Sequence, residues 1–328
     1  MAAGTRPTGC MKSRSVSITG ATGFLGWHLS AAFRDAGWRV RAIVRPGNTK
    51  RVPEGVDLVE SALAPAALTA ALADSSLLVH SAALVRAATD GEIDRVNVGG
   101  ASAAVAAANA AGARLLFISS QAAIGPGTAV REDDAPHPIT AYGRSKLAAE
   151  AVVRAESRVP WTIVRPSAVY GPRDRGFLPL FWLASRGVFL MVASPATPFT
   201  FIYVNDLIAG LMAAAVDERA VGQTMFLGHP APETADDLMR AVADAFGRAY
   251  RPIRLPSFVM RIAGAAGDVC WKLGLNPAVD SARAAEIRAG GFVCAVDRAR
   301  DLLGFTAAVP LRDGVARTAR WYRDQGWV

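Results

Sequence analysis

Short runs of β-branched and aliphatic residues alternate with longer, alanine-rich amphipathic segments through the first half of the chain. The runs that predict strands are 15–19, 39–44, 56–60, 77–80, 114–119 and 161–165. The segments that predict helices are 25–36, 65–72, 92–111 and 141–158. Strands that alternate with helices indicate a parallel sheet, because parallel strands are joined by helical crossovers. We therefore expect an α/β fold with a doubly wound parallel sheet, whose ligand lies at the carboxyl ends of the strands.

The second half of the chain has a looser pattern, richer in Gly and Pro, and its helical segments are 177–186, 234–246, 257–271 and 311–325. We interpret it as a smaller, mostly helical lobe over the strand ends. The expected organisation is a leader over residues 1–13, a sheet domain over 14–170 and a lobe over 171–328, with residues 200–228 returning in part to the sheet domain. Within that stretch, residues 205–217 are the segment that could return as a covering helix.

Composition excludes several classes of protein. The chain has 328 residues, of which 52% are hydrophobic and 20% charged, which argues against a disordered chain and is ample for a core. Cys10, Cys270 and Cys294 show neither pairing nor metal-ligand spacing. We expect no disulfide framework and no metal site, and a reducing compartment fits best.

Targeting and membrane signals are weak. The longest apolar stretch, 177–192, is interrupted by Arg186 and is shorter than a membrane span requires. Residues 1–13 lack the apolar block of a secretory signal. We expect a soluble, cytoplasmic protein.

The formal charge of +8 raises the question of nucleic-acid binding. The basic residues are scattered singly, without a basic tract or interleaved aromatic residues. A nucleic-acid site usually gathers both, so we expect no nucleic-acid partner.

The segment TGATGFLG, residues 19–26, follows a predicted strand and opens a predicted helix. In such a turn Gly20 allows the tight bend, Gly23 lets the backbone approach a pyrophosphate, and Gly26 allows close packing of helix on strand. The helix N-terminus then presents free N–H groups to the phosphates. This context favours a dinucleotide site over an ordinary glycine turn.

The residues at the end of the second predicted strand indicate whether the cofactor is NAD or NADP. NAD sites usually carry an acid there, which binds the ribose 2′-OH. Here Val44 is followed by Arg45, with Lys50 and Arg51 nearby and no carboxylate in this loop. We therefore expect NADP, with NAD as the alternative; Arg45 could also be a solvated loop residue.

Tyr142 and Lys146 are four residues apart in a predicted helix, which places both on one face. An ammonium near a tyrosine favours the phenolate, so the pair can serve as acid and base. Ser120, at the end of a predicted strand, could donate a hydrogen bond to the substrate oxygen. Spacing alone does not decide between Ser119 and Ser120.

A series of motifs stands along almost the whole chain: TGATGFLG from Thr19, VHSAA from Val79, NVGG from Asn97, FISSQAAIG from Phe117, YGRSK from Tyr142, RPSAVYGP from Arg165 and FIYVNDL from Phe201. In this order they resemble the extended short-chain dehydrogenase/reductase superfamily, in its epimerase/dehydratase-like branch. The resemblance implies a Rossmann-like cofactor domain, Ser120 as the catalytic serine, and a homodimer joined through the helices that hold Asn97 and Tyr142. The predicted cofactor contacts are Gly20, Thr22, Gly23, Phe24, Leu25, Gly26, Arg45, Ala82, Ala83, Tyr142, Lys146, Pro166, Ser167 and Val169.

The chain departs from the family pattern in two places. Ala62-Leu63 stands where the family carries Asp-Leu after the third strand, so the adenine contact is weaker or supplied elsewhere. RPSAVYG lacks the Asn of nucleotide-sugar members, and no GDG…R block precedes FIYV. A sugar nucleotide needs cations for its diphosphate, which makes this substrate class less favoured.

The stretch over 177–201 is dominated by Phe, Leu, Trp and Met, which suits an apolar ligand with one reactive oxygen. The chain is most similar to the 3β-hydroxysteroid dehydrogenase and dihydroflavonol reductase-like branch, which ends with a segment like 302–328. We therefore expect an NAD(P)-dependent oxidoreductase that interconverts a secondary alcohol and a ketone on a steroid- or terpenoid-like substrate. The alternative functions are a nucleotide-sugar epimerase or dehydratase and a non-catalytic cofactor-binding sensor. The apolar residues of 177–201 could also serve only to pack the lobe.

Residues 257–275 form an amphipathic segment with Arg261 and Lys272. Core packing is its favoured role, because Gly and Asp interrupt the apolar face. Contact with a membrane surface is the alternative.

Overall fold

The computed structural model describes residues 14–48, 51–191, 194–272 and 280–328. At its centre lies a seven-stranded sheet in the order β12-β7-β5-β4-β1-β2-β3, with every neighbouring pair parallel. The strands are β1 (Ser15–Thr19), β2 (Arg39–Val44), β3 (Asp57–Glu60), β4 (Leu77–His80), β5 (Arg114–Ile118), β7 (Trp161–Pro166) and β12 (Thr224–Leu227). The strand order reverses between β1 and β4, which is where doubly wound sheets bind their ligands.

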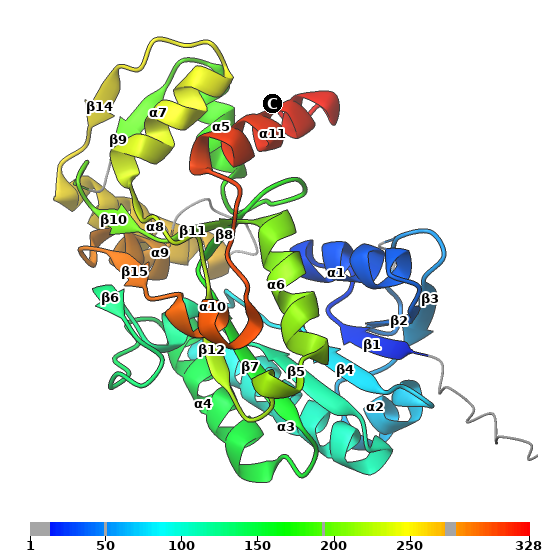
Figure 1. Ribbon diagram of the computed structural model, residues 1–328. Helices are drawn as coiled ribbons and strands as arrows, with labels where there is room; N and C mark the ends of the chain where they lie inside the picture. The colour runs from blue at the N-terminus through cyan, green and yellow to red at the C-terminus, as the bar shows by residue number, and fades with distance from the viewer. Residues whose placement is uncertain (1–13, 49–50, 192–193, 273–279) are drawn as a thin grey trace, which may run out of the picture.

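Helices cover both faces of this sheet (Figure 1). One face carries α1 (Phe24–Asp35) and α6 (Val204–Val216), and the other carries α2 (Pro65–Leu72), α3 (Asp90–Ala111) and α4 (Ala141–Glu156). The alanine-rich face of α3 packs in the chain's own core, where Ala101, Ala104 and Ala108 are fully buried. This packing accounts for the alanines without a second subunit, so the dimer stays a prediction.

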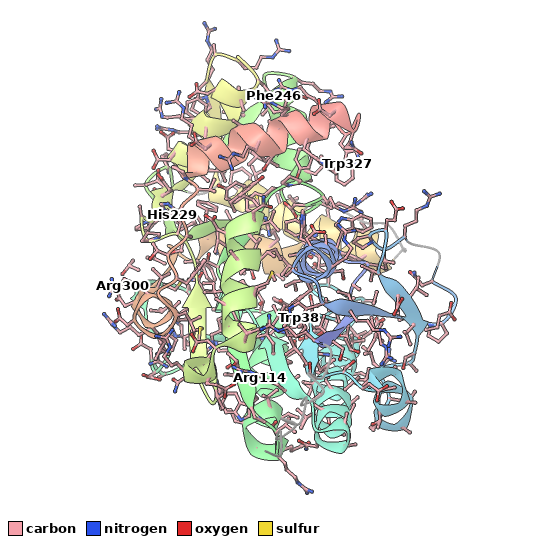
Figure 2. The ribbon with its side chains drawn as sticks, turned by 45° about the vertical axis from the view of Figure 1, so that its right-hand side comes forward. Trp38, Arg114, His229, Phe246, Arg300 and Trp327 are labelled. Atoms are coloured by element: carbon pink, nitrogen blue, oxygen red, sulfur yellow. The ribbon has the colours of Figure 1, made fainter. Side chains whose placement is uncertain are left out.

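The rest of the chain builds the lobe over the strand ends. Helices α5 (Leu178–Ser185), α7 (Ala235–Ala245) and α11 (Leu311–Asp324) lie together at the top of Figure 1. Trp327, labelled in Figure 2, folds back so that its ring stacks on Tyr322 with 5.6 Å between ring centres. The remaining helices are α8 (Ser257–Lys272), α9 (Ser281–Arg288) and α10 (Asp297–Leu303), with short 3-10 turns η1 (Gln121–Ala123) and η2 (Glu218–Ala220).

Three small sheets complete the fold. The order β13-β10-β15-β6 joins Glu233–Thr234, Pro198–Phe199, Phe292–Cys294 and Gly127–Val130. Two further pairs join β8 (Ala168–Tyr170) to β11 (Phe201–Tyr203), and β9 (Phe189–Met191) to β14 (Pro252–Arg254). The sheet of four is therefore built by segments from both halves of the chain.

The predicted fold class is confirmed, and the segment 205–217 does return to cover the sheet, as α6. The pattern missed β12, the seventh strand of the sheet. This strand has only four residues and lies between Gly222 and Gly228, so little in its own sequence marks it. Its pairing with β7 is a long-range contact that periodicity cannot reveal.

Candidate active site

The glycine turn packs directly against the loop that follows β4. Gly20 has a φ of 70°, and a Cβ atom there would lie 2.8 Å from the backbone N of Ala82. A Cβ on Gly26 would lie 2.2 Å from the carbonyl oxygen of Gly20. Thr19 Oγ1 accepts hydrogen bonds from the N–H groups of Ser81 and Ala82 at 3.2 and 3.3 Å. Gly26 is therefore required by close packing, as predicted, and Gly20 by its positive φ at the bend and by the nearby backbone of Ala82.

The N-terminus of α1 begins at Gly23, which is exposed and provides no side-chain cap. Thr22, Phe24 and Leu25 lie half-buried around it. An uncapped helix N-terminus presents free N–H groups and partial positive charge, which suits a pyrophosphate.

Besides Trp271 Nε1 on α8, two buried side-chain atoms lack a hydrogen-bond partner among the described residues: Gln121 Nε2 and Ser167 Oγ. Gln121 follows the end of β5, and Ser167 follows the end of β7 between Pro166 and the half-buried Val169. Buried polar groups normally have partners, so these atoms fit the polar end of a bound cofactor. Ser167 was among the predicted cofactor contacts, whereas nothing in the sequence indicated Gln121.

At the end of β2, Arg45 and Arg51 are exposed, and Lys50 lies outside the described residues. The sequence suggested that no acid is near. The structure brings one from β3, because the Gly47 N–H donates to Glu60 Oε2 at 3.4 Å. In the sheet, β4 and β1 separate β2 from β5, the strand that leads to Ser120.

The side chains of Ser120 and Tyr142 interact, and Ser120 Oγ also accepts a hydrogen bond from the Ala122 N–H at 3.1 Å. The first turn of α4 approaches η1 very closely, since a Cβ on Gly143 would lie 2.3 Å from the carbonyl oxygen of Ala122. Thr140 caps this turn by accepting from the Gly143 N–H at 3.1 Å. The missing side chain at residue 143 thus lets the phenol reach the serine.

Lys146 is buried behind this pair. Its Nζ donates to the carbonyl oxygen of Ile118 at 2.6 Å and lies 4.4 Å from the centre of the Phe117 ring. Burial lowers the pKa of Lys146 to about 8, although the charge of Glu150 opposes the shift. The Phe117 ring also stacks with His80, with 5.6 Å between the ring centres.

His80 links this region to the cofactor turn, because its Nδ1 lies 3.0 Å from Thr19 Oγ1. Burial and the charge of Lys146 lower the pKa of His80 to about 3, so the ring is neutral at physiological pH. Thr19, His80, Phe117 and Lys146 form a continuous series of contacts from the glycine turn to the ammonium.

The pKa of Tyr142 does not follow the expectation that Lys146 favours the phenolate. Burial raises the pKa of Tyr142 to about 12; the hydrogen bond with Ser120 lowers it and the charge of Glu286 raises it. Lys146 directs its ammonium at the Ile118 carbonyl instead. In this state the phenol keeps its proton at neutral pH and can act as a proton donor.

Sequence analysis missed a buried ionic network beneath the site. Ser119 Oγ donates to Glu150 Oε1 at 2.5 Å, and Arg165 binds both carboxylate oxygens, with Nε–Oε1 at 2.9 Å and Nη2–Oε2 at 2.8 Å. Burial raises the pKa of Glu150, but Arg165 and Ser119 outweigh burial and hold that pKa below its ordinary value. Glu150 lies one helical turn beyond Lys146, a spacing that could have indicated the pair.

Asn97 fixes the loop after β4 against α4. Its Oδ1 accepts from the Leu84 N–H at 2.7 Å, and its Nδ2 donates to the Leu84 carbonyl at 3.0 Å and to Ser145 Oγ at 2.8 Å. Ala83 belongs to this loop. The cofactor loop and the helix of Tyr142 are thus held together through one buried amide.

A carboxyl group from the lobe also faces the site. Glu286, on α9, interacts electrostatically with the phenol of Tyr142, and burial raises the pKa of Glu286. The start of α9 is fixed by Asp280, which accepts from the Arg283 N–H at 2.7 Å and pairs with Arg86 at 3.1 Å. No sequence motif indicated Glu286, because the contact depends on how the lobe folds over the sheet.

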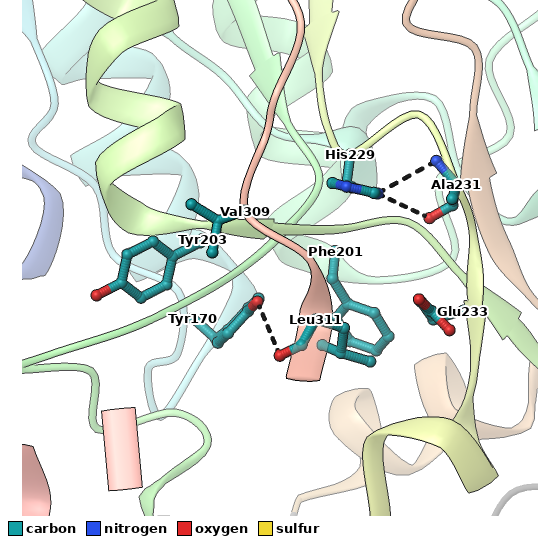
Figure 3. A pocket seen from close by; sticks show the side chains of 8 residues that line it. All are labelled: Tyr170, Phe201, Tyr203, His229, Ala231, Glu233, Val309 and Leu311. Carbon is teal, nitrogen blue, oxygen red and sulfur yellow. Dashed lines mark hydrogen bonds between the residues drawn. The ribbon is translucent and has the colours of Figure 1, made fainter. Parts of the chain in front are cut away.

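Figure 3 shows a separate crevice between β8, β11 and the segment that leads into α11. Its lining residues are Tyr170, Phe201, Tyr203, His229, Ala231, Glu233, Val309 and Leu311. The crevice has no room for a water molecule, and the Tyr170 hydroxyl donates across it to the Leu311 carbonyl at 3.4 Å. The crevice does not include Ser120, Tyr142 or Lys146.

The sequence pattern of the NAD dependent epimerase/dehydratase family matches residues 16–228. A ceramide reductase from Caulobacter vibrioides is 35% identical over 95% of this chain and 96% of its own length. The chain belongs to the NAD-dependent epimerase/dehydratase family. It is accordingly an NAD-dependent enzyme of the extended short-chain dehydrogenase/reductase type.

Other family members agree in fold and differ in what their names describe. A ketoreductase from Stigmatella aurantiaca, named for a farnesylated dihydroquinoline oxide, is 27% identical over 91% of this chain and 93% of its own length. Among solved structures, MoeE5 in complex with UDP-glucose and NAD is 26% identical, with a TM-score of 0.74 over 95% of this chain and 99% of that one. The UDP-glucuronic acid 4-epimerase of Bacillus cereus is 20% identical, with a TM-score of 0.75 over the same shares, which shows a common fold.

Proposed function

We propose that this protein is an NAD(P)-dependent reductase that interconverts a ketone and a secondary alcohol on a hydrophobic, lipid-like substrate. Two relatives that match nearly the whole chain are named for such substrates, a ceramide and a farnesylated ring. The steroid- or terpenoid-like substrate expected from the sequence falls within this class.

The acid that acts on Tyr142 from the lobe supports the choice of substrate class. Glu286 is the charged group that acts on the Tyr142 phenol, and Glu286 in turn interacts with Arg283, Asp280 and Arg86. Arg86 is already paired with Asp280 at 3.1 Å. A diphosphate requires a surplus of positive charge, whereas a neutral ketone does not.

In the proposed mechanism, the nicotinamide supplies the hydride when the cofactor is bound. Tyr142 donates its phenolic proton to the carbonyl oxygen as the alcohol forms. Ser120 donates a hydrogen bond to the same oxygen and stabilises the negative charge that develops there. Lys146 keeps a positive charge beneath the site and would hold the ribose of a bound cofactor. In the oxidative direction Tyr142 takes the proton back.

We further propose NADP as the preferred cofactor, because Arg45 and Arg51 lie exposed at the end of β2, where a 2′-phosphate would bind. Glu60 is the feature that favours NAD, since its carboxylate lies at the same end of the sheet. Comparing the Michaelis constants of NADPH and NADH tests the assignment, and a lower constant for NADH would contradict it.

The second candidate is a nucleotide-sugar epimerase or dehydratase, which the likeness to MoeE5 with UDP-glucose favours. A non-catalytic sensor is less well supported, because Ser120, Tyr142 and Lys146 are all present.

The deciding experiment incubates the protein with NADPH and a panel of ketones, including a 3-ketoceramide, a steroid ketone and an aromatic ketone. We expect loss of NADPH absorbance with at least one lipid ketone and formation of the corresponding alcohol by mass spectrometry. In parallel, UDP- and dTDP-sugars are tested for a rise in Tm and for conversion. Conversion of a nucleotide sugar, with no turnover of any ketone, would overturn the proposal.

A further inference from the structure

Helix α8 has one packed face and one apolar face that is open to solvent. Met260, Gly264 and Gly267 are buried on the packed face. Phe258, Ile262 and Val269 are exposed to 59%, 65% and 56%. Their spacing of four and seven residues places them in one stripe along the helix. Core packing, the role favoured from the sequence, is therefore wrong for this stripe.

The exposed charges in the segment that carries the stripe have one sign. Within residues 248–291, the exposed charged side chains that the structure describes all belong to arginines: Arg248, Arg251, Arg254, Arg261 and Arg288. The acids in the same segment, Asp268, Asp280 and Glu286, are half-buried or buried. A segment that combines exposed apolar side chains with exposed arginines complements an apolar layer bordered by anionic groups.

We propose that the stripe of Phe258, Ile262 and Val269 docks on the surface of a bilayer that contains anionic lipids. The three side chains enter the boundary between headgroups and acyl chains, while Arg261 and Arg254 reach the lipid phosphates. None of the helices in the described part of the chain combines the length and apolar character that a bilayer crossing needs, so the contact is peripheral. A second copy of the chain fits less well, because a stable dimer buries about 800 Å² per partner and three side chains on one helix provide much less.

The docking helix is attached to the substrate side of the site. Asp268 on α8 accepts hydrogen bonds from the N–H and the hydroxyl of Ser281 at 3.0 and 2.5 Å. Gly264 lets the two helices approach, since a Cβ there would lie 3.1 Å from the Cα of Ser281. Ser281 opens α9, the helix of Glu286, so the bilayer contact would lie next to the entry side for a lipid substrate. The docking itself does not depend on the proposed reaction.

Cosedimentation of the full chain with vesicles tests the proposal, without cofactor or substrate. One set of vesicles is phosphatidylcholine and the other contains phosphatidylcholine and phosphatidylglycerol in equal parts. We expect the protein to pellet with the anionic set, and Phe258→Ser with Ile262→Ser to lower the partition coefficient at least about tenfold. Arg254→Gln and Arg261→Gln should each lower binding about fivefold, on the anionic vesicles alone.

The matched control is Leu58→Ser with Val216→Ser, which removes two exposed apolar side chains on the sheet domain and should leave binding unchanged. Equal Tm values for the two double variants show that both are folded. The proposal is overturned if the wild type stays in the supernatant with both vesicle sets, or if Phe258→Ser with Ile262→Ser pellets as well as the wild type. It is also overturned if the wild type binds no vesicles and forms a dimer that Phe258→Ser with Ile262→Ser dissociates.

Discussion

Ser119 and Ser120 are neighbours in the chain, yet the Ser119 hydroxyl donates to Glu150 while the Ser120 side chain interacts with Tyr142. Successive side chains of an extended segment point to opposite sides, which accounts for the division. Sequence spacing left the two serines as alternatives for the catalytic role. The geometry favours Ser120 for the substrate oxygen and Ser119 for the buried network.

This division predicts opposite effects for two alanine variants. Ser120→Ala should lower kcat about 100-fold with little effect on stability, because it removes the hydrogen bond to the reacting oxygen. Ser119→Ala should lower the free energy of unfolding by about 1.5 kcal/mol, because Glu150 loses a buried donor. Steady-state rates and urea unfolding of both variants measure the effects. The reverse pattern would assign the catalytic role to Ser119.

Tyr142→Phe should lower kcat by about 1,000-fold, because it removes the proton donor and preserves the ring. NADPH binding, followed by fluorescence titration, should be unchanged. Tyr250→Phe is the matched control, since that hydroxyl binds Asp236 in the lobe. Turnover by Tyr142→Phe at the wild-type rate would contradict the proposed mechanism.

The pH dependence of ketone reduction should report Lys146. Because burial lowers the pKa of Lys146 to about 8, its positive charge is present below that pH and lost as pH rises through it. We therefore expect kcat/KM to fall above pH 8, while Tyr142, with a pKa of about 12, stays protonated. Lys146→Arg keeps a charge at higher pH, so any activity it retains should decline later. An unchanged decline in this variant would assign the pH dependence to another group.

Glu150→Gln should lower the free energy of unfolding by about 3 kcal/mol, because Arg165 is left buried without a counter-ion. Arg154 binds the same carboxylate from a more exposed position, so Arg154→Ala is the control and should cost no more than about 1 kcal/mol. Urea unfolding at neutral pH measures both. Equal losses would mean that the Glu150–Arg165 pair contributes little.

Arg45→Ala should raise the Michaelis constant for NADPH about tenfold and change that for NADH little, because only NADPH carries the 2′-phosphate. Arg39→Ala, at the opposite end of the same strand, is the control. An equal rise in the Michaelis constants for NADPH and NADH would show that Arg45 contacts a part of the cofactor that the two share.

The sequence predicted those parts of the site that depend on local pattern. The β1–α1 turn needs glycines at residues 20 and 26 because other backbone atoms lie within a few ångström of both. Such a requirement can be inferred from the spacing of glycines in the sequence. Tyr142 and Lys146 share one helix, so helical spacing placed them together. Glu286, Gln121 and Glu60 could not be predicted, because each reaches the site through tertiary packing.

The hydrogen bonds from Ser281 to Asp268 connect an outward-facing helix to the helix beside the phenol. An enzyme arranged in this way would meet its substrate in two dimensions. Its rate should then follow the mole fraction of substrate within the lipid layer, so that adding inert lipid slows turnover even when the total amount of substrate in the tube stays the same.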